Sequence, residues 1–241
     1  LTALPLFVWM GEILFRTRLS ENLFKGLSPW MQKLPGGLIH VNVVGCALFA
    51  AISGSSAATV ATVGKMSIPE LRKRNYPEKI LLGSLAGSGT LGLLIPPSII
   101  LIIYGVAVQE SIAKLFIAGI LPGIMIALIF MSYVIFWSLI NKKQMPKIVE
   151  KYSIFEKIKR SKQLLPVIIL ISAVIGSIYT GIATATEAAS LGVVGALILS
   201  YFQKSLTLET FKTSLLGATK TSCMIAFILA GSTFLSLAMG F

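Results

Sequence analysis

The chain has 241 residues, of which 55% are hydrophobic and 12% are charged, and its formal net charge is +12. Soluble domains carry about 25% charged residues, so this composition excludes an ordinary soluble domain and indicates an integral membrane protein. Several apolar runs approach the roughly 20 residues of a membrane-spanning helix, and no set of evenly alternating ten-residue segments is present. The expected fold class is therefore an all-α, polytopic membrane protein.

Three basic segments, residues 16–35, 65–79 and 141–163, together hold the whole net positive charge. Cytoplasmic loops of membrane proteins collect Lys and Arg, so we place all three segments on the cytoplasmic side. Basic loops can also bind nucleic acid, but these lack groove-reading or aromatic elements beside them, and we expect no nucleic-acid partner. The apolar residues 2–15 are expected to arrive inside at the first basic segment.

Residues 36–64 lie between two of these basic segments, which a single crossing would place on opposite sides of the membrane. We therefore predict a re-entrant hairpin that turns at the sequence "SGSS", residues 53–56, and returns without emerging. Irregular backbone at membrane depth is tolerated only where protein or a water-filled cavity supplies hydrogen-bond partners. The polar tip is therefore predicted to be a binding element.

Residues 80–108 form an apolar run that Gly92 and the pair Pro96 and Pro97 interrupt. Proline removes a backbone donor and clashes with the preceding turn, so a broken helix is predicted. Carbonyl oxygens released from a helix, together with serine hydroxyls, can ligate a small hard cation such as sodium. Gly and Pro also serve packing alone in membrane helices, but two breaks together favour an ion and substrate site.

The remaining segments follow from the same apolar runs. We predict a turn near Glu110 on the outside, a transmembrane helix over 112–140, the basic cytoplasmic loop 141–163, a helix pair over 164–202 with an outside turn near Thr184, and a transmembrane helix over 209–239. Thr186 and Glu187 are expected to start the second helix of the pair, by N-capping and by placing negative charge at the positive end of the helix dipole.

The residues then resemble a known family, the DctM-like large membrane subunit of tripartite ATP-independent periplasmic (TRAP) transporters. The resemblance covers nearly the whole chain and rests on five stretches: "LPLFVWMGEIL", "LPGGLIHVNVVGCALFAAISGSSAATVATVG", "GTLGLLIPPSIILIIYGV", "LFIAGILPGIMIALI" and "GIATATEAAS". It implies an elevator-type, inverted-repeat secondary transporter in the bacterial inner membrane. Such a transporter imports an organic acid, such as a C4-dicarboxylate or sialic acid, with sodium as the coupling ion. The implied partners are a small membrane subunit and an extracytoplasmic substrate-binding protein, and no cofactor or enzymatic activity is expected.

The resemblance also assigns site residues. The family's first sodium site falls on the hydroxyls of Ser53 and Ser55 and on the backbone of Gly92, Ile95 and Pro97. The wider sodium and substrate set is Ser53, Gly54, Ser55, Ser56, Gly92, Ile95, Pro96, Pro97 and Ser98. Thr59, on the returning arm of the hairpin, is expected to lie outside this shell.

The sequence departs from the family pattern in two places. A second hairpin and a second proline-broken helix, which would hold the second sodium site, do not occur before Phe241, so we expect a piece of a longer chain, truncated at both ends. Ala185 stands where the family usually has proline.

Three other functions stay open at this point. The first is another ion-coupled inverted-repeat carrier of dicarboxylates or citrate, which would need no binding protein. The second is a membrane scaffold that transports nothing. The third is an intramembrane serine protease, which would need a base near Ser55, and the single histidine, His40, lies about four helical turns away. A metal site built on Cys or His is not expected, because Cys46 and Cys223 have no partner at ligand spacing.

Overall fold

The computed structural model describes residues 2–17, 19–146, 152–162 and 164–239, and every regular element in these ranges is a helix. The elements in chain order are α1 (Ala3–Phe15), α2 (Leu19–Met31), α3 (Ile39–Ser53), α4 (Ser56–Lys73), α5 (Glu78–Gly89), the 3₁₀ helix η1 (Thr90–Leu93), α6 (Ile99–Ala107), α7 (Ile112–Ile140), the 3₁₀ helix η2 (Lys142–Gln144), α8 (Ile154–Ser161), α9 (Leu165–Tyr179), α10 (Ala185–Phe202) and α11 (Leu208–Met239). The all-α fold class is confirmed. Part of the predicted basic loop 141–163 lies outside the described residues.

Three of the described helices, α7, α10 and α11, are long and apolar enough to cross a membrane, and α8 with α9 would make a fourth span. The most apolar is α7, with a mean hydropathy of 2.4 over its best window, yet only 17% of that window is buried inside the protein. An apolar helix whose side chains stay uncovered is suited to a hydrocarbon surrounding. The described helices are therefore those of a membrane protein.

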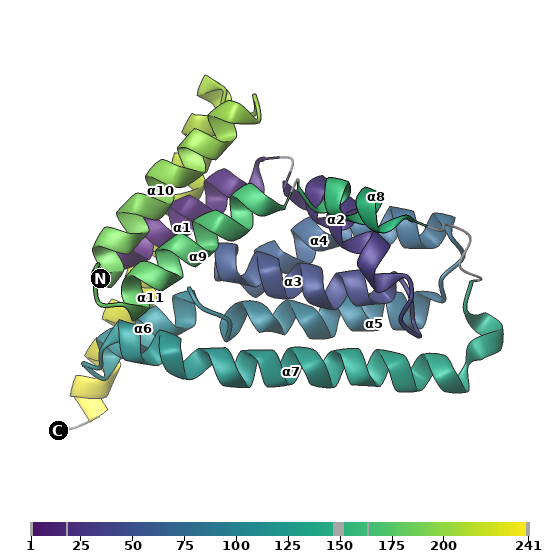
Figure 1. Cartoon of the computed structure of the whole chain (residues 1–241). Coiled ribbons are helices and arrows are strands. Elements are labelled where there is room, and N and C mark those ends of the chain that lie inside the picture. The colour runs from purple at the N-terminus through teal and green to yellow at the C-terminus, as the bar shows by residue number, and fades with distance from the viewer. Residues whose placement is uncertain (1, 18, 147–151, 163, 240–241) are drawn as a thin grey trace.

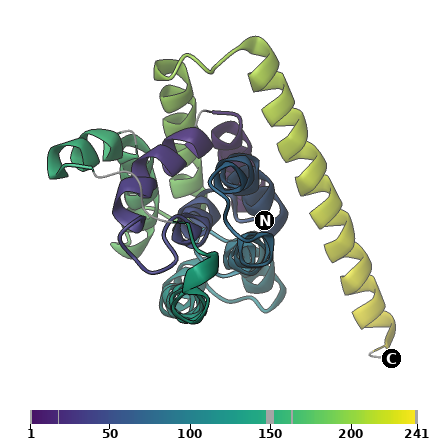
Figure 2. The same ribbon diagram turned by 90° about the vertical axis from the view of Figure 1, so that its right-hand side faces the viewer.

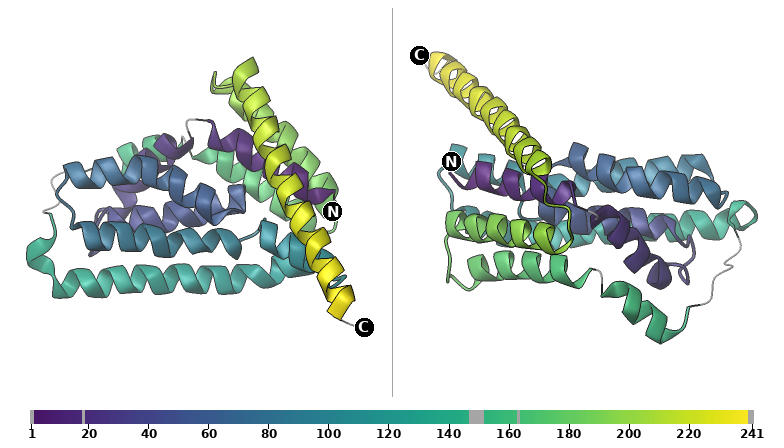
Figure 3. Two further views of the ribbon diagram at one scale, coloured as in Figure 1. Left: turned by 180° about the vertical axis from the view of Figure 1, so that it is seen from behind. Right: turned by 90° about the horizontal axis from the view of Figure 1, so that it is seen from above.

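The helices form two packed groups, which α1 connects (Figure 1). In one group α3 packs against α4, α5 and α7, and in the other α1 packs against α10 and α11 while α9 lies on α10. Contacts of α1 with α3 and α6 join the two groups. The C-terminal part of α11 stands away from the other helices (Figures 2 and 3), which leaves most of its surface uncovered.

The returning arm of the predicted hairpin is longer than expected. Helix α4 continues to Lys73, so residues 65–73, which we predicted as part of a basic loop, are helical. The charges do not stop the helix, because Glu70 and Arg74 lie one turn apart and form an ion pair with an N···O distance of 3.0 Å. The connection to α5 is therefore short, and begins at Arg74.

The start of α10 differs from the prediction by two residues. Thr184, and not Thr186, is the N-cap: its hydroxyl accepts a hydrogen bond from the N–H of Glu187 at 3.4 Å. The Glu187 carboxylate in turn accepts from the N–H of Thr184 at 2.8 Å. This reciprocal pairing is a capping box, which requires the Glu three residues after the cap.

The connections gather at two ends of the molecule. In Figure 1 the α6–α7 and α9–α10 connections lie at the left, whereas the α2–α3 and α4–α5 connections and the end of α7 lie at the right. The left-hand connections are the two turns that we place outside, and the right-hand group belongs to the basic segments. Which end faces the cytoplasm stays a prediction, and cysteine labelling tests it.

Candidate functional site

The hairpin tip is made by two residues with different backbone roles. Gly54 ends α3 in the left-handed conformation, with φ of +57°, which glycine adopts without a Cβ penalty. Ser55 then turns to an extended conformation and caps α4, because its hydroxyl accepts from the N–H of Ala58 at 3.5 Å. The sequence "SGSS" thus ends one helix and starts the next within two residues.

The break in the second element, like the hairpin turn, is caused by the residues at the break itself. After α5 and η1, the backbone leaves the helical ladder at residues 94–98, where Pro96 and Pro97 offer no N–H. Ser98 stabilises the break, since its hydroxyl donates to the carbonyl of Leu93 at 2.6 Å. Helix α6 then starts at Ile99.

The two elements meet at two glycines. A methyl group built on Gly92 would lie 3.0 Å from the carbonyl carbon of Ser55 and 3.0 Å from the amide nitrogen of Ser56. A methyl group on Gly54 would lie 2.9 Å from the carbonyl oxygen of Pro97. Such distances leave no room for a side chain, so the hairpin tip and the broken helix touch backbone to backbone.

Not every predicted residue lies in this contact. The side chain of Ile95 packs on α7, where a methyl group on Gly123 would lie 2.8 Å from its Cγ1. Pro96 likewise faces Gly119, at 3.6 Å from such a methyl group. These two side chains therefore anchor the break to α7, and only their backbone could serve an ion.

Several oxygen atoms near the contact have no partner in the described part of the chain. The hydroxyl of Ser56 is buried without a hydrogen bond, and no hydrogen bond uses the carbonyl oxygens of Ile95 or Pro97. Buried polar atoms are normally satisfied, so each such atom needs a partner. Neutral oxygens of this kind are the ligands that a small hard cation takes, so the residues fit sodium.

Thr59, in the first turn of the returning arm, lies beside the hairpin tip. Its hydroxyl is 2.9 Å from the hydroxyl of Ser53, and both residues are buried. The Ser53 hydroxyl also donates to the carbonyl of Ser55 and accepts from its N–H, both at 3.3 Å. Thr59 thus contacts the tip through Ser53, and its place outside the shell of the ion stays a prediction.

A small pocket opens beside the tip. Its volume is about 80 Å³, and its polar lining comes from Glu12 of α1, Ser53 and Ser55 of the hairpin, and Thr221 of α11. Helix α1 approaches so closely because Gly11 lies against the backbone of Ile52 and Ser53, 3.0 Å from each for an added methyl group. Ligand pockets usually measure about 300–1,000 Å³, so this one suits an ion with its water better than an organic acid.

Glu12 is the site residue that our sequence reasoning missed. It is the one carboxylate in the apolar run 2–15, and an ionisable residue inside a membrane segment is by default a functional candidate. It pairs with Arg16, one turn later, which also donates from Nη1 to the carbonyl of Glu12 at 3.0 Å. The same guanidinium donates to the carbonyl of Thr213 at 3.2 Å, which links α1 to α11.

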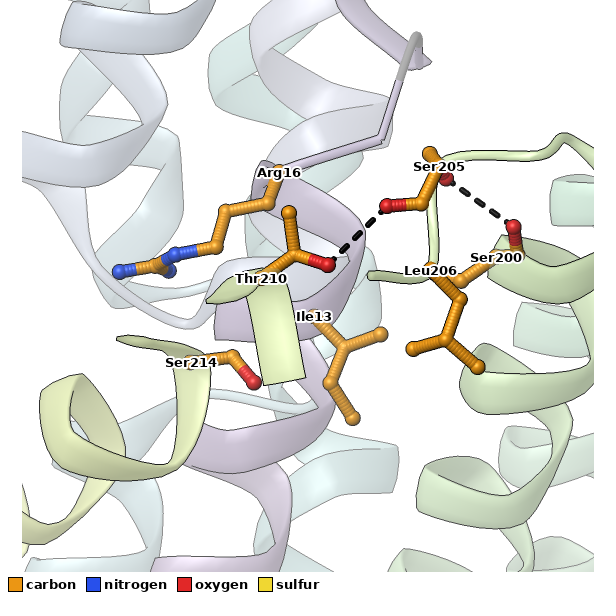
Figure 4. A pocket seen from close by; sticks show the side chains of 7 residues that line it. All are labelled: Ile13, Arg16, Ser200, Ser205, Leu206, Thr210 and Ser214. Atoms are coloured by element: carbon orange, nitrogen blue, oxygen red, sulfur yellow. Dashed lines mark hydrogen bonds between the residues drawn. The ribbon is translucent and has the colours of Figure 1, made fainter. Parts of the chain in front are cut away.

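A second polar pocket lies at the other side of Arg16, between α1, α10 and α11 (Figure 4). Ser205 donates to the carbonyl of Ser200 and Thr210 donates to that of Ser205, both at 3.1 Å, while the guanidinium points away from both serines. The cavity measures about 10 Å³, which is room for about one water molecule. It therefore cannot hold an organic acid.

The comparisons with known proteins agree on one family. The sequence model of the family described as "Tripartite ATP-independent periplasmic transporter, DctM component" matches residues 1–241. The C4-dicarboxylate TRAP transporter large permease protein DctM of Pseudomonas aeruginosa is 34% identical over 96% of this chain and 54% of its own length. The sialic acid large permease SiaM of Vibrio cholerae is 34% identical, over 97% of this chain and 54% of its own length. The ectoine/5-hydroxyectoine large permease UehC of Ruegeria pomeroyi is 33% identical, over 96% and 54%. This chain thus spans about half the length of these relatives.

Proposed function

Because the chain belongs to the DctM component family of TRAP transporters, we propose that it is part of a large permease subunit that imports an organic acid with sodium as the coupling ion. The whole permease would work in the bacterial inner membrane with a small membrane subunit and an extracytoplasmic substrate-binding protein. The family match favours this function over a carrier that works without a binding protein.

The observation that carries the proposal is the contact of Gly92 with the peptide that joins Ser55 to Ser56. Re-entrant and broken elements that meet at membrane depth are how secondary transporters build ion and substrate sites. The tip supplies serine hydroxyls and no charged side chain, and the carbonyl oxygen of Pro97 lies against Gly54. A sodium ion binds several oxygen atoms, and neutral oxygens serve this purpose. The carbonyl oxygens inside an intact helix do not, because they already accept backbone hydrogen bonds.

The proposed ligand set differs from the one expected from the sequence. We propose the hydroxyls of Ser55 and Ser56 and the carbonyls of Ile95 and Pro97, with Gly92 supplying the close approach. Ser53 acts more through its hydrogen bonds to Thr59 and Ser55, which fix the tip. The Glu12 carboxylate lines the pocket while paired with Arg16, and it would offer a charged oxygen to a cation that enters.

The substrate class follows from the relatives and not from the pocket. The printed names of the relatives include C4-dicarboxylate, sialic acid and ectoine permeases. Because the described pocket at the tip is smaller than these molecules, we propose that the substrate lies between this half and the remaining part of the permease. Molecules of all three classes carry a carboxylate, which leads us to an organic acid.

The proposal is tested with the full permease and its two partners reconstituted in liposomes. Uptake of labelled succinate, sialic acid and ectoine is measured with an inward sodium gradient, with potassium in place of sodium, and without the binding protein. We expect uptake of one substrate class that requires both sodium and the binding protein. Equal uptake in potassium would exclude sodium coupling, and uptake without the binding protein would favour the other class of carrier.

A further inference from the structure

A larger pocket lies at the opposite end of α3 from the hairpin tip. Its volume is about 430 Å³, within the range of about 300–1,000 Å³ that ligand sites occupy. Its walls come from three places: the α2–α3 connection at residues 33–37, Tyr76 in the α4–α5 connection, and the end of α7 with the residues that follow it. In Figure 1 these segments lie together at the right.

The charged side chains that line this pocket are basic. Lys33 and Lys142 line it, and no acidic residue of the described ranges does. Neither ammonium group is paired with a carboxylate in the described ranges of the chain. Two cations that share a pocket without a counter-charge favour an anionic ligand.

Two neutral donors also face the ligand space. Ser138 is only 5% exposed, and its hydroxyl has no hydrogen bond to any described residue. The hydroxyl of Tyr76 accepts from the N–H of Leu38 at 3.1 Å, so its own proton is free to donate. Burial raises the pKa of Tyr76, which keeps that proton in place. Both groups suit the oxygen atoms of a phosphate.

The pocket opens onto apolar surface. Leu139 lines it and is 47% exposed. Phe136 and Ile140, each 66% exposed, lie four residues apart on the same helix, and Phe136 is three residues from Leu139. Helix α7 is the most apolar span of the described helices. A ligand that fits both surfaces must carry an anionic head and long apolar chains, which a free phosphate does not.

We infer that this pocket binds the headgroup of an anionic glycerophospholipid. Lys33 and Lys142 bind the phosphate together with Ser138 and Tyr76, and the acyl chains lie along the exposed face of α7. Basic pockets between membrane helices on the cytoplasmic side are suited to such headgroups. The site is independent of sodium coupling, because it lies a helix length away from the hairpin tip.

The experiment measures lipid retention by the full permease in detergent with native mass spectrometry. The purified protein is incubated with equal amounts of dioleoyl phosphatidylglycerol and dioleoyl phosphatidylcholine. We expect phosphatidylglycerol to be retained in preference to phosphatidylcholine. In the double variant Lys33→Gln/Lys142→Gln the ratio of the two retained lipids should fall by about fivefold for each lysine removed. A large excess of inorganic phosphate should not displace the lipid, because the acyl chains contribute to binding.

The matched control is Lys204→Gln/Lys212→Gln, which removes the same charge from exposed positions near α11. It should retain phosphatidylglycerol as the unchanged protein does. The lipid site is overturned if the Lys33/Lys142 double variant keeps its preference, or if the control variant loses as much. Displacement by inorganic phosphate would identify a site for a soluble anion instead and would equally overturn the proposal.

Discussion

The hydroxyl of Ser53 lies 2.9 Å from the hydroxyl of Thr59, so the last residue of one hairpin arm is tied to the first turn of the other. Both residues are buried, and the pair closes the hairpin just behind the tip. Ser53 therefore holds the turn, whereas the peptide between Ser55 and Ser56 faces Gly92 of the broken helix.

Changing Ser55 to Ala should raise the sodium concentration for half-maximal uptake. Removing one neutral ligand from a buried site costs on the order of 1–3 kcal/mol, which corresponds to roughly five- to 150-fold in affinity. Sodium-dependent uptake by the reconstituted complex measures the effect. Ser190→Ala, which removes an exposed hydroxyl from α10, is the control and should leave sodium dependence unchanged. Normal sodium dependence in Ser55→Ala would remove Ser55 from the ion site.

Thr59→Ala should lower stability before it changes affinity for the ion. It leaves the buried hydroxyl of Ser53 without this partner, at a cost of about 1–3 kcal/mol. Thermal unfolding of the purified permease should shift downward, and the double variant Ser53→Ala/Thr59→Ala should recover part of the loss, since both polar groups are then gone. A double variant less stable than Thr59→Ala would show that the pair is not coupled.

A methyl group at Gly92 should push the hairpin tip away from the broken helix. Gly92→Ala places a carbon 3.0 Å from the peptide between Ser55 and Ser56, and such overpacking costs about 1–3 kcal/mol. We expect uptake to fall by about tenfold or more while the protein still inserts. Gly83→Ala, on the preceding helix α5, has nothing within 4 Å of the added carbon and should transport normally. Equal behaviour of the two variants would contradict the close contact as the functional element.

Glu12→Gln tests whether the carboxylate draws sodium to the pocket. The neutral side chain should raise the sodium concentration for half-maximal uptake by about tenfold, which corresponds to about 1.4 kcal/mol of binding free energy. Arg16→Gln is the matched control, because it breaks the same ion pair but keeps the negative charge. If both variants change sodium dependence alike, Glu12 acts through the ion pair and not through its charge.

The re-entrant hairpin predicts that two positions label from the same side of the membrane. Lys25 on α2 and Lys73 at the end of α4 are exposed, and each is changed to cysteine in a Cys223→Ser background, because Cys223 is itself exposed. Membrane-impermeant maleimide should reach both only from the cytoplasmic side. Labelling from opposite sides would show that residues 36–64 cross the membrane.

The turn and the break could be predicted because their causes are local. Gly54 and Ser55 specify a helix end and a helix start by their own backbone and side-chain chemistry, and the two prolines interrupt a helix wherever they stand. The extent of α4 was less predictable, since we took its basic residues as a loop signal although charge does not end a helix. The cap at Thr184 was missed for a related reason: the Glu three residues later decides which Thr is the cap.

The sequence by itself therefore determined the membrane environment, the all-α fold class and the places where helices break, because composition and local backbone chemistry govern these features. Only the tertiary structure decided which distant residues meet. Gly92 lies against Ser55 and Ser56, Glu12 reaches the pocket beside Ser53, and Lys33 shares a pocket with Lys142. Those contacts depend on how α1, α5 and α7 pack around the hairpin, and packing is set by the shapes of whole helix surfaces that no single motif encodes.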